Sequence, residues 1–182
     1  GAYVVEKESI EKENEDKETQ VVVIGGGGAG FAAAITAKEA GAEVILLEKL
    51  PTVGGNTQIS GGEYAAPANE IQQAEGIEDS PELFAQDMEA AGGDPALIRV
   101  LSENATPSAE WLRDDIGVEF LDSLMFFGGH SVKRSLIPVG HSGLEIIQKY
   151  QAKADELGIE VLTEHDVKEL LSGDGKIVGV RV

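Results

Sequence analysis

The sequence contains no cysteine, few basic residues and no long apolar run. The absence of cysteine excludes disulfide bonds, thiolate zinc sites and catalysis by a thiol. Lysine and arginine number 14 against 33 acidic residues, and the formal net charge of −19 argues against a nucleic acid as partner. No apolar run approaches the length of a membrane span, so we expect no membrane insertion by this chain. These absences leave cytoplasm, cell envelope and extracellular space all open as compartments.

The acidic residues are spread over the predicted helix faces. They show neither the spacing of metal ligands nor the pairing of two catalytic carboxylates. The sequence therefore predicts no metal site, and any chemistry has to come from another feature of the chain.

The segment most indicative of function is 21–48. It opens with a β-branched run, which predicts a strand buried on both faces. Gly25, Gly27 and Gly30 then fit the pattern G-x-G-x-x-G, and an alanine-rich stretch predicts a helix. In a dinucleotide site these glycines allow a tight turn, approach of a phosphate and close packing of the helix, whose free amides bind the anion. Glu48 ends the next predicted strand, where a carboxylate can bind a ribose diol.

The pattern by itself also fits an ordinary βαβ unit with a flexible turn. A second glycine-rich loop argues for a flavin, because the ribityl chain and isoalloxazine extend past the pyrophosphate and need further donors. This loop contains Gly54, Gly55, Asn56 and Thr57, followed by Ser60, Gly61 and Gly62. A domain that binds only NAD has no need of it, so the sequence favours FAD, although Asn56 and Thr57 also suit a plain turn with a capping side chain.

The motifs GGGGAG, LEK, GGNT and SGG together resemble the FAD-binding domain of the fumarate reductase and succinate dehydrogenase flavoprotein family. The resemblance is closest to the soluble branch of flavocytochrome c fumarate reductases and urocanate reductases. It implies an α/β fold, a Rossmann-like doubly wound FAD-binding domain whose N-terminal part is 20–182. A strand pattern continues to Val182, so we expect this domain to be incomplete at its C-terminal end. Residues 1–19, almost all charged or polar, are expected to be a linker or the tail of an upstream module.

The resemblance also implies which residues contact the cofactor. They form the pyrophosphate turn, the ribose acid, the loop on the flavin side and a strand that touches adenine: Gly25, Gly27, Gly28, Ala29, Gly30, Glu48, Lys49, Gly55, Asn56, Thr57, Ser60, Gly61, Gly62 and Val167. The loop before Gly61 is one residue shorter than in the usual soluble member. Membrane-bound relatives attach FAD through a histidine where this chain has Asn56, so non-covalent FAD is expected.

A third motif, at 127–134, resembles the family segment that runs beneath the flavin toward the substrate. Phe127, Gly128 and Gly129 match its substrate-proximal positions. A bulky Phe127 beside the ring would press a planar alkene against it, although Phe127 also suits a hydrophobic core. Arg134 is more typical of a structural ion pair than of a phosphate ligand. His130 belongs to no evident catalytic constellation.

The activity that the resemblance implies is that of an FAD-dependent oxidoreductase. It reduces the C=C bond of a fumarate-like or acrylate-like carboxylate by hydride transfer from flavin N5. No catalytic residue is expected in this chain, because the clamp domain and the second half of the FAD domain lie in the remaining C-terminal part. The electron donor implied is a haem, FMN or quinol-linked module. Two alternatives stay open: another enzyme on this scaffold, of the ketosteroid dehydrogenase or amino-acid oxidase type, and a stand-alone, non-catalytic flavin-binding module.

Local signals predict the remaining elements. Helices are expected from Ser80, from Asp94, from Ser108 and over 142–157, because each start has a capping side chain. Strands are expected at 159–162, 167–171 and 176–182, the last two joined by a hairpin turn. Glycine and proline punctuate 50–69, which predicts a loop.

Overall fold

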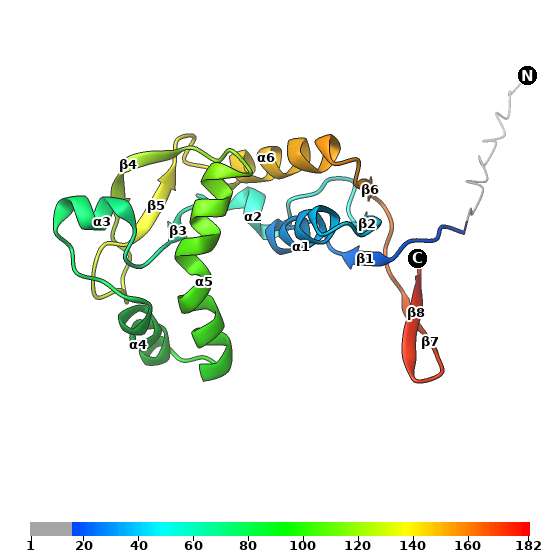
Figure 1. The fold of residues 1–182 in the computed structure, drawn as a ribbon, viewed down its shortest axis with the longest axis horizontal. Coiled ribbons are helices and arrows are strands. Elements are labelled where there is room, and N and C mark those ends of the chain that lie inside the picture. The colour runs from blue at the N-terminus through cyan, green and yellow to red at the C-terminus, as the bar shows by residue number, and fades with distance from the viewer. Residues whose placement is uncertain (1–15) are drawn as a thin grey trace, which may run out of the picture.

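The computed structural model describes residues 16–182, so most of the linker predicted at 1–19 lies outside the described residues. Two groups of elements lie along the long axis of the molecule (Figure 1). One contains a small parallel sheet, and the other contains a small antiparallel sheet with three of the helices. The mixed fold confirms the predicted α/β class.

The parallel sheet has the strand order β1-β2-β6. β1 (Val21–Ile24) pairs with β2 (Val44–Leu47), and β2 pairs with β6 (Glu160–Leu162). β2 is buried along its whole length, as expected for a central strand. β1 lies at the edge, and its Val22 and Ile24 are 37% and 53% exposed. The prediction that β1 is buried on both faces is therefore wrong, because within 16–182 one of its faces has no cover.

Two helices build the core beside this sheet. α1 (Gly28–Glu39) connects β1 to β2 and buries Phe31, Ala34 and Ile35. α6 (Gly143–Glu156) packs against α1, and the rings of Phe31 and Tyr150 stack with their centroids 5.8 Å apart. This contact is part of the core that joins the two helices.

The antiparallel sheet has the order β3-β5-β4 and forms the other group with three helices. Its strands are β3 (Tyr64–Ala65), β5 (Ser135–Pro138) and β4 (Phe120–Met125), and the helices are α3 (Glu70–Glu75), α4 (Pro81–Ala91) and α5 (Pro95–Asp114). The prediction of a loop over 50–69 is wrong in part, because α2 (Gly55–Ile59) and β3 lie within it.

Capping side chains start α4, α5 and α6 as predicted. Ser80 accepts a hydrogen bond from Leu83 N, Asp94 accepts from Ala96 N, and Ser142 accepts from Leu144 N. A separate helix from Ser108 does not exist, since α5 continues through Pro107. The buried side of α5 extends from Ile98 to Leu112, so tertiary packing on both sides of the proline outweighs the hydrogen bond that it removes.

The C-terminal hairpin consists of β7 (Glu169–Gly173) and β8 (Lys176–Arg181) and projects from the rest of the molecule (Figure 1). Its turn residues Asp174 and Gly175 both have positive φ, as a two-residue hairpin turn requires. The predicted hairpin is confirmed, with β7 starting at Glu169. None of the helices in 16–182 combines the length and the apolar character needed to cross a bilayer.

Candidate functional site

The first glycine-rich turn joins the carboxyl end of β1 to α1. Gly25 has φ of 104°, which favours glycine, and a Cβ on Gly30 would lie 1.8 Å from the Gly25 carbonyl oxygen. A Cβ on Gly27 would meet nothing closer than the Gly54 carbonyl oxygen at 3.9 Å. Gly30 is thus needed for packing, whereas Gly27 faces space in which a phosphate could approach the backbone.

The N-terminus of α1 is suited to bind an anion. Its N-cap is Gly27, which offers no side-chain cap, and its first turn contains no acidic residue. The amide of Gly28 donates to Thr57 Oγ1 at 3.3 Å. The hydroxyl of Thr57 therefore stays available as a donor at the positive end of the helix dipole, where negative charge is stabilised by about 0.3–1 kcal/mol.

Glu48 is a buried carboxylate held by the turn itself. It is 7% exposed, Oε2 accepts from Gly26 N at 2.8 Å, and Oε1 accepts from Leu50 N at 2.8 Å. A carboxylate can accept about four hydrogen bonds, so both oxygens keep capacity for a ligand. Gly26 is a site residue that the sequence analysis missed: a Cβ there would lie 2.8 Å from Val53 Cγ1, so only glycine brings this amide to Glu48.

The second glycine-rich loop lies against the first. Gly54 N donates to Gly26 O at 2.7 Å, and Gly27 and Gly54 form a parallel bridge. Ser60 O accepts from Gly143 N at 2.9 Å, which ties the end of α2 to the start of α6. The structure therefore brings the two predicted motifs together at the N-terminus of α1.

Other predicted residues of this loop have different environments. Asn56 is exposed, and its side chain makes no hydrogen bond within the described residues. Ser60 Oγ donates to Thr57 O at 2.8 Å and accepts from Gly62 N at 3.2 Å, so it shapes the turn through Gly61. A polar Asn56 facing solvent beside the α1 terminus is available to a ligand, whereas the Ser60 hydroxyl is engaged with the chain.

Val167 follows a segment that runs alongside Glu48. Glu48 N donates to Leu162 O at 2.8 Å, and His165 N donates to Glu48 O at 2.9 Å. Val167 thus follows, two residues after His165, the segment that pairs with the Glu48 backbone at the end of β2 and β6, and Lys49 is exposed.

Phe127, Gly128 and Gly129 are not part of this cluster. They belong to the loop that connects β4 to β5, in the other group of elements. Phe127 is 39% exposed, which contradicts the alternative that it is a core residue. One link between the two regions is β3, which comes shortly after Gly62 and pairs with β5.

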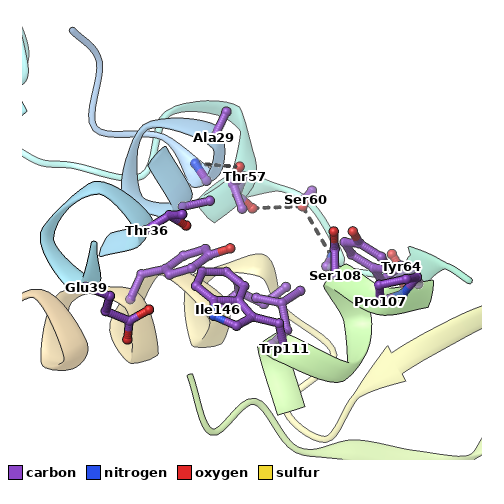
Figure 2. Close-up of a pocket in the computed structure, with 16 residues that line it drawn as sticks. Ala29, Thr36, Glu39, Thr57, Ser60, Tyr64, Pro107, Ser108, Trp111 and Ile146 are labelled. Carbon is purple, nitrogen blue, oxygen red and sulfur yellow. Dashed lines mark hydrogen bonds between the residues drawn. The ribbon is translucent and has the colours of Figure 1, made fainter. Parts of the chain in front are cut away.

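A cavity of about 680 Å³ opens beside the N-terminus of α1, between α1, α5 and α6 (Figure 2). Five predicted site residues line it: Gly28, Ala29, Thr57, Ser60 and Gly62. Its aromatic wall was not predicted from the sequence and consists of Trp111 and Tyr150, whose ring centroids lie 5.9 Å apart. Burial raises the pKa of the Tyr150 phenol, so this wall stays uncharged at neutral pH. Within the part of the chain that the structure describes, His, Asp and Glu form no group of three that could hold a metal ion.

Comparison with known proteins agrees with this geometry. The family model described as FAD binding domain matches residues 20–182. A urocanate reductase from Eggerthella lenta is 47% identical over 169 residues, which are 90% of this chain and 28% of that protein. A cytochrome-type fumarate reductase from Shewanella frigidimarina is 39% identical over 89% of this chain and 29% of its own length. The flavoprotein subunit of an acrylate reductase from Shewanella woodyi is 37% identical over 92% of this chain and 34% of its own length.

Solved structures give the same result. The open conformation of a flavocytochrome c3 fumarate reductase superposes with a TM-score of 0.84 at 39% identity, over 89% of this chain and 29% of that one. A 3-ketosteroid-Δ4-(5α)-dehydrogenase from Rhodococcus jostii RHA1 superposes with a TM-score of 0.82 at 30% identity, over 94% of this chain and 43% of that one. This chain spans about three tenths of the length of the curated relatives it matches. The resemblance to fumarate and urocanate reductase flavoproteins is confirmed, and the chain belongs to the FAD binding domain family, whose cofactor is FAD.

Proposed function

We propose that this chain is the N-terminal FAD-binding part of a flavoprotein reductase, whose substrate is a fumarate-like or acrylate-like unsaturated carboxylate. The observation that carries the proposal is the joining of the two glycine-rich motifs at the α1 terminus beside the anchored carboxylate of Glu48. Relatives named for the reduction of urocanate, fumarate and acrylate support the substrate class.

In this proposal each part of the site holds one part of FAD without a covalent bond. The amides of Gly27 and Ala29 bind the pyrophosphate together with the hydroxyl of Thr57, which the Gly28 amide holds in place. Glu48 accepts the hydroxyls of the adenosine ribose, and the strand beginning near Val167 contacts adenine.

The remaining predicted contacts belong to the flavin half of the cofactor and to the substrate. The loop through Gly55, Asn56 and Gly61 faces the ribityl chain and ring. When bound and reduced by two electrons from the donor module, FAD would supply a hydride from N5 to an electron-poor carbon. Phe127 limits the space beside the ring, so that a planar substrate is held close to it.

The groups that bind the substrate carboxylate and deliver the proton are proposed to lie outside this chain, in a C-terminal part that completes the FAD domain and supplies a clamp domain. An electron-donor module, whether haem, FMN or quinol-linked, is a further expected partner. The N-terminal segment 1–19 would connect to such a module.

The test uses the full-length polypeptide purified with FAD, and its flavin is first reduced under anaerobic conditions. Fumarate, urocanate and acrylate are each added, and reoxidation of the flavin is followed by its visible absorbance. Rapid reoxidation by at least one of these acids is expected. Reoxidation by none of them, at rates above that of a saturated acid, would refute the proposed activity.

A ketosteroid dehydrogenase is the second candidate, favoured by the superposition on the enzyme from Rhodococcus jostii RHA1. That candidate predicts the opposite reaction in the same protein: oxidised flavin is bleached by a 3-ketosteroid, and the unsaturated acids do not react. If the protein were an amino-acid oxidase, amino acids would bleach its oxidised flavin instead. A non-catalytic module would fold and bind FAD as residues 1–182 alone, and would react with none of these compounds.

A further inference from the structure

The loop that carries Phe127 ends on a fully buried arginine. Arg134 is 0% exposed, and its Nε and Nη2 donate to the two oxygens of Asp79 at 2.9 and 3.0 Å. Its Nη1 donates to Asp87 Oδ2 at 2.6 Å, and its guanidinium carbon lies 4.7 Å from the centroid of the Phe84 ring. The expected structural ion pair is therefore present, and both of its acids lie on the α3–α4 side of the molecule.

Asp87 also reaches into the middle of the loop. Its Oδ2 accepts from Ser131 N at 2.8 Å, and its Oδ1 accepts from Ser131 Oγ at 2.5 Å. Burial alone would raise the pKa of the Asp87 carboxyl, but the hydrogen bonds from Ser131 and the charge of Arg134 lower it below its ordinary value. Asp87 is therefore an anion at neutral pH, and it ties α4 to the loop by three hydrogen bonds.

Asp79, which binds Arg134 beside Asp87, is itself held by further hydrogen bonds. Gln72, which is fully buried, donates to Asp79 Oδ2 at 2.8 Å and to Lys133 O at 2.6 Å. Ser80 N donates to Asp79 Oδ1 at 2.9 Å. Asp79 thus keeps its place through contacts that do not involve the tip of the loop, and Arg134 connects Asp79 to Asp87.

His130 connects Ser131, which is bonded to Asp87, with Phe127. His130 N donates to Phe127 O at 3.2 Å, which closes a turn. The His130 ring lies between two phenyl rings, with its centroid 5.7 Å from that of Phe84 and 6.4 Å from that of Phe127. Its Nδ1 is buried without a hydrogen-bond partner among the described residues, and the ring contacts both Phe84 of α4 and Phe127.

We propose that Asp87 is a positioning residue for the substrate side of the site. Fixed by Arg134, it binds Ser131 and so sets the place of the turn that carries Phe127. We call Asp79, Asp87, Ser131 and Arg134 the loop clamp. Its role in turnover rests on the proposed function, since only there does Phe127 face the substrate.

The test compares Ser131→Ala with Ser131→Thr in the full-length, FAD-loaded protein. Ser131→Ala removes one of the three bonds to Asp87 and leaves the buried ion pair intact, whereas Ser131→Thr keeps the hydroxyl. Ser123→Ala is the matched control, because Ser123 is an exposed serine on β4 of the same hairpin. Hydrogen exchange of the 126–134 amides, FAD content, and kcat and KM for the unsaturated acid are measured.

For Ser131→Ala we expect loop exchange to rise about tenfold, in line with the loss of one charge-assisted hydrogen bond. We expect KM to rise more than kcat falls, at unchanged FAD content, with both restored in Ser131→Thr. Unchanged hydrogen exchange of the 126–134 amides in Ser131→Ala would overturn the idea that the loop clamp holds this loop. Faster exchange with unchanged KM and kcat, or a loss of FAD parallel to the loss of activity, would overturn its positioning role. If the unmodified protein reduces no unsaturated acid, the proposed function fails, and the exchange data still decide whether Asp87 holds the loop.

Discussion

Removing the Glu48 carboxylate should weaken the binding of FAD by about a hundredfold. In the Glu48→Ala variant the two ribose hydroxyls lose their acceptor. A net contribution of about 1.5 kcal/mol for each charge-assisted hydrogen bond gives about 3 kcal/mol. At about 1.4 kcal/mol for each factor of ten, this is a loss of about two orders of magnitude in affinity.

The same substitution has a second effect, which has to be separated from the first. Gly26 N and Leu50 N both donate to this carboxylate, so the apoprotein also loses two hydrogen bonds. We expect a lower melting temperature for the apoprotein, because an unsatisfied buried amide costs about 1–3 kcal/mol. The affinity must therefore be measured directly, by titrating the folded apoprotein with FAD in a calorimeter.

Comparison with FMN makes the assay specific for the ribose. FMN has no adenosine, so its affinity should change far less than that of FAD. Glu43→Ala is the control, because Glu43 precedes the same strand, is exposed, and pairs only with Lys38 in the described structure. An FAD dissociation constant within about threefold of the unmodified protein, or an equal loss for FMN, would refute the ribose role of Glu48.

Three further predictions concern the first glycine-rich turn, the second loop and His130. Gly27→Ala should leave the apoprotein folded but abolish FAD binding, whereas Gly30→Ala should prevent folding, because its Cβ would lie 1.8 Å from a carbonyl oxygen. Melting curves with and without FAD check both variants, and identical curves for the two variants would contradict these roles of Gly27 and Gly30. Thr57→Val should weaken FAD binding about fivefold to tenfold and Thr57→Ser should not, and calorimetry giving equal affinities would argue against the hydroxyl. Burial and, to a lesser extent, the charge of Arg134 lower the pKa of His130, although the charges of Asp87 and Asp79 raise it. The unfolded chain therefore binds more protons below about pH 6.5, and protection of the loop from hydrogen exchange should fall as pH drops through this range in the unmodified protein but not in His130→Phe.

The first half of the site could be predicted because its signals are local. The turn, the helix after it and the acid at the end of the next strand follow one another within a single βαβ unit, so spacing alone identified Gly25, Gly27, Gly30 and Glu48. The contact of the second loop with the first, through Gly54, depends on the tertiary fold, and the sequence only suggested it.

The rest of the fold depends on distant partners. β4 has two adjacent exposed residues and a shift in its pairing with β5, so it lacks the alternation that marks a strand. Ser108 suggested the capped start of a separate helix, but the buried face of α5 continues past it. The partners of Arg134 are 47 and 55 positions away in sequence, so the ion pair was expected without its acids.

A crystal structure of the FAD-loaded protein tests the central claim most directly. The pyrophosphate should lie on the amides at the start of α1, with the ribose hydroxyls on Glu48 and the flavin beside the loop through Asn56. A structure in which FAD is bound elsewhere, or in which Glu48 bonds only to the backbone, would contradict the account.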